Sequence, residues 1–195
     1  MSPKPNENKV LFGFSDLYIG TFTENEDGSV TMGEPYHQRG AVGWSPEEQG
    51  SQYTFYADNV SYYNYYTTGT EQGDLVVARF DDDFKTQFMG YIETDDGGVA
   101  KVKNAIKPNI YMCYEIQGDK GPERIIYYNG SMGGITRENA TIEESIEVQT
   151  EKTQITFTGD NKTGISSVSY PEGSAGFDAM FTNPPAPKLP DQPSE

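Results

Sequence analysis

The feature that most constrains the fold is a tyrosine-rich run, YTFYADNVSYYNYYTTG, at positions 53–69. Six of these 17 residues are tyrosine and one is phenylalanine. Aromatic and β-branched residues favour strands. The run therefore predicts either one long strand or two strands broken near Asp58 and Asn59.

Alternation along this run predicts aromatic side chains on both faces of the strand. Tyr63 and Tyr65 share one side, whereas Tyr62 and Tyr66 share the other. An antiparallel sheet with one solvent-exposed face is expected to carry aromatic side chains only on the face that packs on the core. One face can enter the core of the molecule, so the other needs a cover as well.

Two covers are possible for the second aromatic face. A helix of the same chain could lie on it, or other copies of the chain could pack against it. Tyrosine suits an interface between copies because its ring buries a large apolar area while its hydroxyl keeps a polar partner. The sequence therefore makes Tyr56, Tyr63 and Tyr65 candidate subunit-interface residues.

The remaining pattern predicts a mainly β protein. The chain has 195 residues, of which 13% are aromatic, and it carries 21 glycines. We expect an antiparallel β-sandwich or barrel with one short flanking α-helix. The expected strands are 10–22, 53–66, 75–80, 91–95, 110–117, 124–130, 145–159 and 163–170. Turns are expected at 24–29, 67–74, 117–123 and 159–164, and an extended, irregular segment at 29–50.

A short amphipathic helix is predicted over 80–90. Asp81 can cap its first turn, where the helix dipole favours the acids that follow. Phe84 and Phe88 stand four residues apart on one face, and Gly90 can end the helix.

The long run 145–159 changes its apolar side partway along, which predicts a bulge or a strand that passes from one sheet to another. Around these elements we expect a flexible N-terminal arm at 1–9, a single domain at 10–183 and a proline-rich tail at 184–195.

The charge and composition exclude several classes of function. The formal charge is −16, with no run of basic residues, so binding of nucleic acid by phosphate neutralisation is not expected. The single cysteine, Cys113, excludes an internal disulfide and reads as a small buried hydrophobe. Residues 1–9 show no signal peptide, and no apolar run is long enough for a membrane helix.

Catalytic equipment is missing from the sequence. The sole histidine, His37, has no nucleophile motif nearby, and there is no phosphate-binding loop, dinucleotide fingerprint or zinc-ligand spacing. We therefore expect no catalytic residue, no metal and no cofactor. A glycosidase needs only two carboxylates, but a chain with 30 acids offers such pairs without specificity.

Much of the chain resembles the major tail protein, or tail tube protein, of long, non-contractile-tailed bacteriophages of Gram-positive hosts. The matching stretches include GEPYHQRGAVGWSPEEQG (33–50), GDLVVARFDDDFKTQFMGY (73–91), KPNIYMCYEIQGD (107–119) and ITFTGDNKTGIS (155–166). Others are NKVLFGFSDLYIGTFT (8–23), TFYADNV (54–60), RIIYYNG (124–130), GGITRE (133–138) and FTNPPAPKLP (181–190).

This resemblance implies two packed β-sheets flanked by a helix, in a subunit that forms hexameric rings. Inner sheets would join edge to edge around a lumen, and rings would stack into a tube in the virion. The implied partners are other copies, a tape-measure protein, and the distal tail and tail terminator proteins. Double-stranded DNA would pass through during genome ejection without specific binding. Assembly would occur in the host cytoplasm, and no membrane is involved.

Two further expectations follow from this resemblance. The segment 33–50, with Gly43 and Trp44, becomes the candidate contact between stacked rings. Acids lining the bore would repel DNA from its walls, and the candidate lumen acids are Glu93, Asp95, Asp96, Glu147 and Glu151.

Two other functions stay open at this point. A monomeric carbohydrate-binding β-sandwich would also use exposed tyrosines, which stack on sugars, and a glycosidase would need two positioned carboxylates. Hollow tubes formed by the purified protein would favour the tail tube over both.

Overall fold

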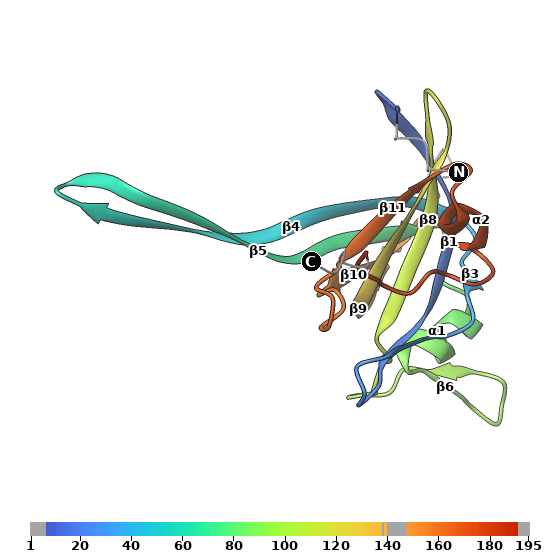
Figure 1. Ribbon diagram of the computed structural model, residues 1–195. Coiled ribbons are helices and arrows are strands. Elements are labelled where there is room, and N and C mark those ends of the chain that lie inside the picture. Colours follow the sequence, from blue (N-terminus) through green and yellow to red (C-terminus); the bar gives the residue numbers. More distant parts are fainter. Residues whose placement is uncertain (1–6, 138, 140–147, 191–195) are drawn as a thin grey trace, which may run out of the picture.

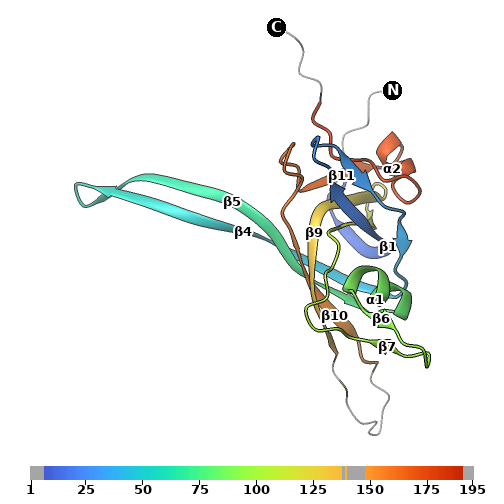
Figure 2. The ribbon, with the colours of Figure 1, turned by 90° about the horizontal axis from the view of Figure 1, so that it is seen from below.

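The computed structural model describes residues 7–137, 139 and 148–190. A curled sheet forms the body, and a long two-stranded hairpin projects far beyond it (Figure 1). The hairpin is the outer part of β4 (Ala41–Ala57) and β5 (Val60–Val77), and we call residues 49–70 the hairpin arm. The view from below shows the same projection (Figure 2). The chain is mainly antiparallel β, as the sequence predicts.

In the described part of the chain, nine strands form the main sheet, and each pairs antiparallel with its neighbours. The order is β2-β1-β8-β9-β10-β5-β4, with β3 paired to β1 and β11 paired to β9. The bounds are β1 (Leu11–Glu24), β2 (Val30–Met32), β3 (Tyr36–His37), β8 (Ile110–Gly118), β9 (Glu123–Arg137), β10 (Glu151–Phe157) and β11 (Ser167–Pro171). A separate ribbon pairs β6 (Ile92–Glu93) with β7 (Val99–Ala100).

Strand β9 has different neighbours on its two edges. β8 pairs along one edge, while β10 and β11 lie end to end along the other, with Phe157 opposite Gly130 and Ser167 opposite Tyr127. The expected hairpin turn at 159–164 is therefore wrong. That segment is a loop that connects β10 to β11, and these two strands run in the same direction because both pair antiparallel with the same edge of β9.

Two hydrophobic clusters lie on opposite faces of the sheet. Successive strand residues point to opposite faces, so Met112 belongs to the first cluster and Cys113 to the second. The helix α1 (Asp82–Met89) covers the first cluster with Phe84 and Phe88. The C-terminal segment covers the second cluster.

The predicted helix at 80–90 is confirmed. The side chain of Asp81 accepts a hydrogen bond from the Phe84 N–H at 2.8 Å, which caps the first turn. Gly90 ends the helix in the left-handed conformation with φ 67°. The rings of Phe80 and Phe84 stack with centres 4.8 Å apart, so the helix is fixed to the sheet by aromatic packing.

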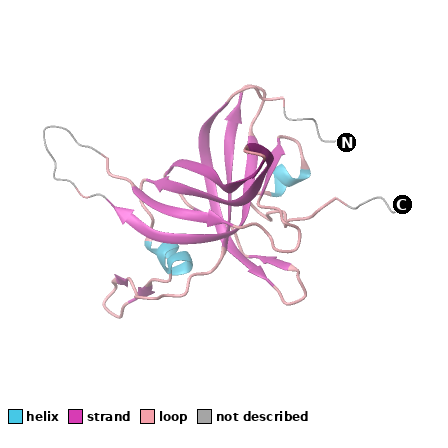
Figure 3. Ribbon diagram, turned by 90° about the vertical axis from the view of Figure 1, so that its left-hand side faces the viewer, coloured by secondary structure: helices cyan, strands magenta, loops and turns pink. Residues whose placement is uncertain are grey.

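A second helix, α2 (Ala175–Ala179), is absent from the sequence prediction. It has only five residues, too few to show a period, and tertiary contacts hold it. The guanidinium carbon of Arg124 lies 4.0 Å from the ring centres of both Phe177 and Phe181. Tyr18 stacks on Phe181 and also on His37, with centres 4.5 Å apart in each pair. This column pins the C-terminal segment to the body. The ribbon shows the short helix of this segment lying beside the strands (Figure 3).

The structure corrects two expectations about the long hairpin. The segment 41–50 is extended as expected, with register shifts between Ala41 and Gly43 and between Glu48 and Gly50, but it is the first part of the regular strand β4. The segment 67–74 lies within β5 and is not a turn. Glycine in this segment suggests a turn, but here it allows β4 and β5 to approach each other closely. A Cβ at Gly73 would lie 2.4 Å from the Ser45 carbonyl oxygen, so a larger residue would push β4 away.

The expected irregularity at 145–159 lies elsewhere. Within β10 the odd-numbered residues are buried without a break, and the register shift falls on the facing strand β9, between Met132 and Ile135. Residues 145–147 lie outside the described part of the chain.

The chain ends, where described, contact the body. The Lys9 N–H donates to the Asp119 carboxylate at 2.7 Å. The Tyr128 hydroxyl donates to the Pro185 carbonyl at 2.8 Å. The rest of the expected N-terminal arm, residues 1–6, and residues 191–195 of the proline-rich tail lie outside the described residues.

Candidate assembly surfaces

The hairpin arm turns at Asp58 and Asn59, which confirms the prediction of two strands broken at this point. Ala57 pairs with Val60 across a two-residue loop. Asp58 and Asn59 have φ values of 52° and 62°, so both are left-handed. A two-residue turn of this kind matches the twist of its flanking strands, and Asn and Asp tolerate it better than other non-glycine residues.

Four aromatic rings share one face of the hairpin arm. Tyr53 lies opposite Tyr65, and Phe55 lies opposite Tyr63. Residues directly opposite on antiparallel strands point to the same side. On the other face Tyr66 lies opposite Gln52. Both faces are therefore aromatic, as the alternation predicts.

The described part of the chain leaves these rings uncovered. Their exposed fractions run from 48% at Phe55 to 75% at Tyr62, and Tyr56, Tyr63 and Tyr65 fall between. The possibility that a helix of the same chain covers them is wrong, because α1 packs against the first hydrophobic cluster instead. An exposed apolar surface of this size makes the hairpin arm a candidate interaction site.

The hairpin arm is also almost free of charge. In a chain with 30 acidic and 14 basic residues, Asp58 at the turn is the sole charged residue between positions 49 and 70. Two copies can therefore approach through the hairpin arm without bringing many like charges together.

Trp44 and Gly43, the candidate ring contact, lie at the base of the hairpin and not in a loop. The Trp44 ring packs edge-on against Tyr127 and Phe157, with ring centres 5.9 Å apart in both pairs. Within a single copy the Trp44 side chain packs against the first cluster of its own subunit, and a contact of this residue with a stacked ring of subunits stays a prediction. Gly43 sits at a register shift beside it, with open space around its Cα.

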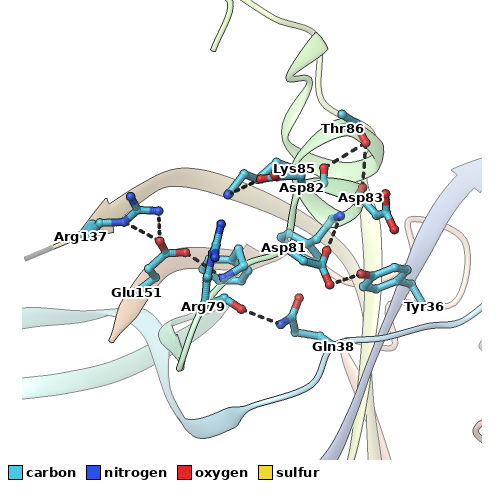
Figure 4. A network of polar contacts seen from close by, with 12 residues as sticks. Tyr36, Gln38, Arg79, Asp81, Asp82, Asp83, Lys85, Thr86, Arg137 and Glu151 are labelled. Carbon is cyan, nitrogen blue, oxygen red and sulfur yellow. Dashed lines mark hydrogen bonds and ion pairs between the residues drawn. The ribbon is translucent and has the colours of Figure 1, made fainter. Parts of the chain in front are cut away.

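Glu151 was expected among the lumen acids, and the structure contradicts this. Glu151 is 3% exposed, and its carboxylate accepts a hydrogen bond from the Phe80 N–H at 2.8 Å. It also forms an ion pair with Arg137 (Figure 4). A buried carboxylate needs such partners, so Glu151 joins β10 to the start of α1 and is unavailable to a bore.

A second polar contact in the same network fixes the start of α1 (Figure 4). The Tyr36 hydroxyl donates to the Asp81 carboxylate at 2.5 Å. Burial, and then this hydrogen bond, raise the pKa of Tyr36 above its usual value of 10.0. The helix cap is therefore held from two sides.

The other candidate lumen acids are exposed or outside the described residues. Glu93, Asp95 and Asp96 lie on the exposed β6–β7 ribbon. The Thr94 hydroxyl donates to Asp96, which holds the pKa of that carboxyl below its usual 3.8. Glu147 lies outside the described part of the chain.

A polar sheet face on β4, β5 and β10 was missed by the sequence reasoning. Buried Leu75 and Ile155 alternate with Asp74 and Gln154, which point outwards. Asp74 lies opposite both Ser45 and Gln154, and the next row joins Glu47, Gln72 and Thr156. We call these residues, with Lys152, the polar sheet face. The sequence feature that indicates this face is the alternation of apolar and polar residues in 71–77. Part of that segment lies in the turn predicted at 67–74.

This face offers little positive charge. The Lys152 ammonium lies 3.6 Å from the Asp74 carboxylate, so its charge is balanced. The remaining charged member is Glu47. The surface therefore consists mainly of amides, hydroxyls and carboxylates.

The described residues contain no group of three or more His, Cys, Asp or Glu side chains placed to hold a metal ion. Nor does any described helix combine the length and apolar character needed to cross a membrane. Cys113 is free and buried, and burial raises the pKa of its thiol.

Comparison with known proteins gives a matching family model. A family model described as phage tail tube protein matches residues 1–164. Among solved structures, the chain is similar to one from an extracellular contractile injection system, the PVC sheath-tube complex in its extended state. The TM-score is 0.49, with 6% identity over 84% of this chain and 93% of that chain. A second is the tube-terminating cap of the anti-feeding prophage, with TM-score 0.49 and 6% identity over 88% of this chain and 99% of that one. No curated protein matches the chain.

Proposed function

The chain belongs to the phage tail tube protein family, and we propose that its copies close into rings of six that stack into a hollow tail tube. As a member of that family it is a structural component of the virion tail and not an enzyme. The number six follows the resemblance to major tail proteins. The observation that carries the proposal is the hairpin arm, whose aromatic faces have no cover in a single copy.

The energy available from the hairpin arm is sufficient for assembly. Its seven aromatic rings are about half exposed, so covering them buries roughly 600–900 Å². That area is close to the ~800 Å² per partner of a stable interface. At ~25 cal/mol/Å² the gross gain is about 15–20 kcal/mol, against a cost of association of about 4–15 kcal/mol. Repulsion between copies of charge −16 acts over only ~8 Å in cellular salt.

Open strand edges support closure into a ring. In the described part of the chain β4 has no neighbour on its outer edge, and β1 has none beside Leu11–Asp16 because β3 and β2 pair only from Tyr18 onwards. Unpaired edges invite pairing with another chain. Pairing of the β1 edge of one copy with the β4 edge of the next leaves neither edge unpaired. Repetition of this one contact from copy to copy closes a ring.

The polar sheet face lines the bore in this proposal. A bore that conducts DNA must not grip phosphate, and on this face Lys152 is already balanced by Asp74. Six copies of a chain of charge −16 carry −96, which repels the DNA as a whole. Glu47 and Asp74 supply acids to the wall, and Glu93, Asp95, Asp96 and Glu147 stay predicted lumen acids.

The other partners follow from the resemblance to major tail proteins. They are a tape-measure protein and the distal tail and tail terminator proteins. Assembly takes place in the host cytoplasm, and the genome passes through the finished tube into the host.

Electron microscopy of the purified protein over a range of concentrations tests the proposal. Hollow tubes of constant width are expected, and they should be absent from a variant in which residues 52–66 are replaced by a short glycine-containing turn. A full-length protein that stays monomeric at high concentration and binds glycans would instead support the carbohydrate-binding module.

A charge test addresses the bore separately. The double variant Glu47→Gln/Asp74→Gln should form normal tubes but slow genome ejection, since it leaves Lys152 free to contact phosphate. Normal ejection by particles carrying this variant would contradict the assignment of the polar sheet face to the bore.

A further inference from the structure

Most of the large exposed apolar side chains of the described chain fall into three groups, and Val42, Val148 and Leu189 lie outside them. The first is the hairpin arm, and the second is the run Val10–Phe12 at the start of β1. The third consists of Ile92, Val102 and Ile106, beyond the C-terminal end of α1. The hairpin arm needs an acceptor surface, and the other two groups are the candidates that gather more than one such side chain.

The third group forms one surface around the end of α1. Ile92 pairs across the β6–β7 ribbon with Ala100, two residues before Val102. A Cβ on Gly90 would lie 2.8 Å from the Cβ of Ala105, so the segment before Ile106 packs directly against the helix end. Ile106 is 94% exposed, which makes it the most exposed large hydrophobic side chain in the described chain.

This surface carries free positive charge. Lys101 and Lys103 are exposed, and within the described residues neither side chain has an ion pair or hydrogen bond. Lys107 instead donates to the carbonyls of Met132 at 3.0 Å and Gly133 at 2.5 Å, which ties the segment to β9. We call Ile92, Lys101, Val102, Lys103 and Ile106 the basic-apolar patch.

The tip of the hairpin arm, residues 56–62, complements this patch in chemistry. It presents exposed Tyr56, Val60 and Tyr62, and its one charge is the carboxylate of Asp58. The apolar side chains of the tip can pack against those of the patch. The ammonium groups of the patch can lie over the tyrosine rings, and the Asp58 carboxylate can pair with a lysine.

The two surfaces cannot meet within one copy. The hairpin arm leaves the body on one side, whereas α1 and the β6–β7 ribbon lie across the body from it in both views (Figures 1 and 2). Any contact between them is therefore made by two copies.

We propose that the tip of the hairpin arm of one copy docks on the basic-apolar patch of a second copy. The inference rests on the proposed self-assembly and adds the acceptor. The run Val10–Phe12 is the poorer acceptor, because it adjoins the open β1 edge at Leu11–Asp16, which pairs with β4 of the next copy in the proposed ring. The acids of the β6–β7 ribbon do not obstruct the patch, since Glu93 alternates with Ile92 to the opposite face and Asp95 and Asp96 lie at the closed end.

Site-directed cross-linking tests the contact. The native Cys113 is 0% exposed, so cysteines introduced at the surface react alone. Asn59→Cys and Ile106→Cys proteins are mixed, assembled and treated with a short bismaleimide. The expected product is a covalent dimer that needs both variants and forms in tubes but not in dilute monomer. In the matched control, Asn59→Cys mixed with Leu11→Cys should give no dimer.

The outcomes separate this inference from the proposed function. Tubes that cross-link through Leu11→Cys, or fail to cross-link through Ile106→Cys, overturn the docking contact and leave the tube intact. A wild-type protein that forms no tubes overturns the proposed function itself.

A charge exchange provides a second measurement that uses no cross-linker. Asp58→Lys should raise the protein concentration needed for assembly about tenfold, the effect of about 1.4 kcal/mol. Adding Lys101→Asp and Lys103→Asp to the same chain should restore assembly. Equal impairment of the single and the combined variant overturns the inference.

Discussion

The guanidinium of Arg124 lies over the ring of Phe181, with its central carbon 4.0 Å from the ring centre. The same guanidinium group donates to the Phe177 carbonyl at 2.6 Å and to Glu115 at 2.9 Å. One side chain on β9 therefore holds Phe177 and Phe181, which lie on either side of the Met180 that enters the second hydrophobic cluster.

Replacing Arg124 with alanine should detach the C-terminal segment. The variant loses a largely buried ion pair and two ring contacts, so the free energy of unfolding should fall by about 2–4 kcal/mol. Denaturant unfolding measures the loss, and limited proteolysis should cut first near residues 172–183. As a matched control, Lys152→Ala removes the exposed pair with Asp74 and should cost less than ~1 kcal/mol. Equal losses in the two variants would contradict the role given to Arg124.

Two substitutions of Glu151 should separate its two contacts. Glu151→Gln keeps an acceptor for the Phe80 N–H but removes the charge that faces Arg137, and should cost about 1–3 kcal/mol. Glu151→Ala removes both contacts and should cost about 3–5 kcal/mol. Thermal unfolding followed by circular dichroism gives both values. If the two variants were equally stable, the hydrogen bond to Phe80 would contribute nothing.

The turn of the hairpin arm should respond to backbone conformation alone. Asn59 has a left-handed φ of 62°, so Asn59→Val should strain the turn by about 1–2 kcal/mol, whereas Asn59→Gly should be tolerated. Amide hydrogen exchange should quicken in residues 52–66 of the valine variant only. The melting temperature of the body should be unchanged in both, because the hairpin arm packs on no other part of the described chain.

The aromatic face of the hairpin arm should control assembly and not folding. Tyr53→Ser/Tyr63→Ser/Tyr65→Ser should leave a monomer with an unchanged melting temperature that forms no tubes. The matched triple Tyr→Phe variant keeps the rings and should assemble. Size-exclusion chromatography and microscopy distinguish the two, and tubes formed by the serine variant would refute the assembly role of this face.

Alkaline pH should unfold the body. Burial raises the pKa of Tyr111, Tyr114 and Tyr128 above the usual 10.0. The folded state thus keeps protons that the unfolded state releases, so this stabilisation is complete below pH 10 and declines as the pH rises above it. Tyrosine absorbance measured across the unfolding transition should show these hydroxyls ionising together with unfolding. Their ionisation in a still-folded protein would contradict the expectation.

The sequence predicts the helix well, because its signals are local. Asp81, the spacing of Phe84 and Phe88, and Gly90 each act within one or two helical turns. The aromatic faces of 53–66 are equally predictable, because the side to which each residue of a strand points follows from its position in the strand and not from the neighbouring strands.

The remainder could not be predicted, because it depends on pairing between distant segments. The glycines and threonines of 67–74 resemble a turn, and only the partner strand β4 makes them a strand. The hydrogen bond from Phe80 to Glu151 joins residues 71 positions apart, and it turns an apparently exposed acid into a buried one. The polar sheet face was hidden for the same reason, since it takes side chains from three strands.

Strand β5 runs without interruption from the tip of the hairpin arm into the body, where residues 71–77 pair with 151–157 of β10. A pull along the hairpin arm therefore acts parallel to this ladder and loads its hydrogen bonds together. They resist as a group under shear and are not unzipped one by one. A filament joined through such elements is built to bear tension along the direction in which they point.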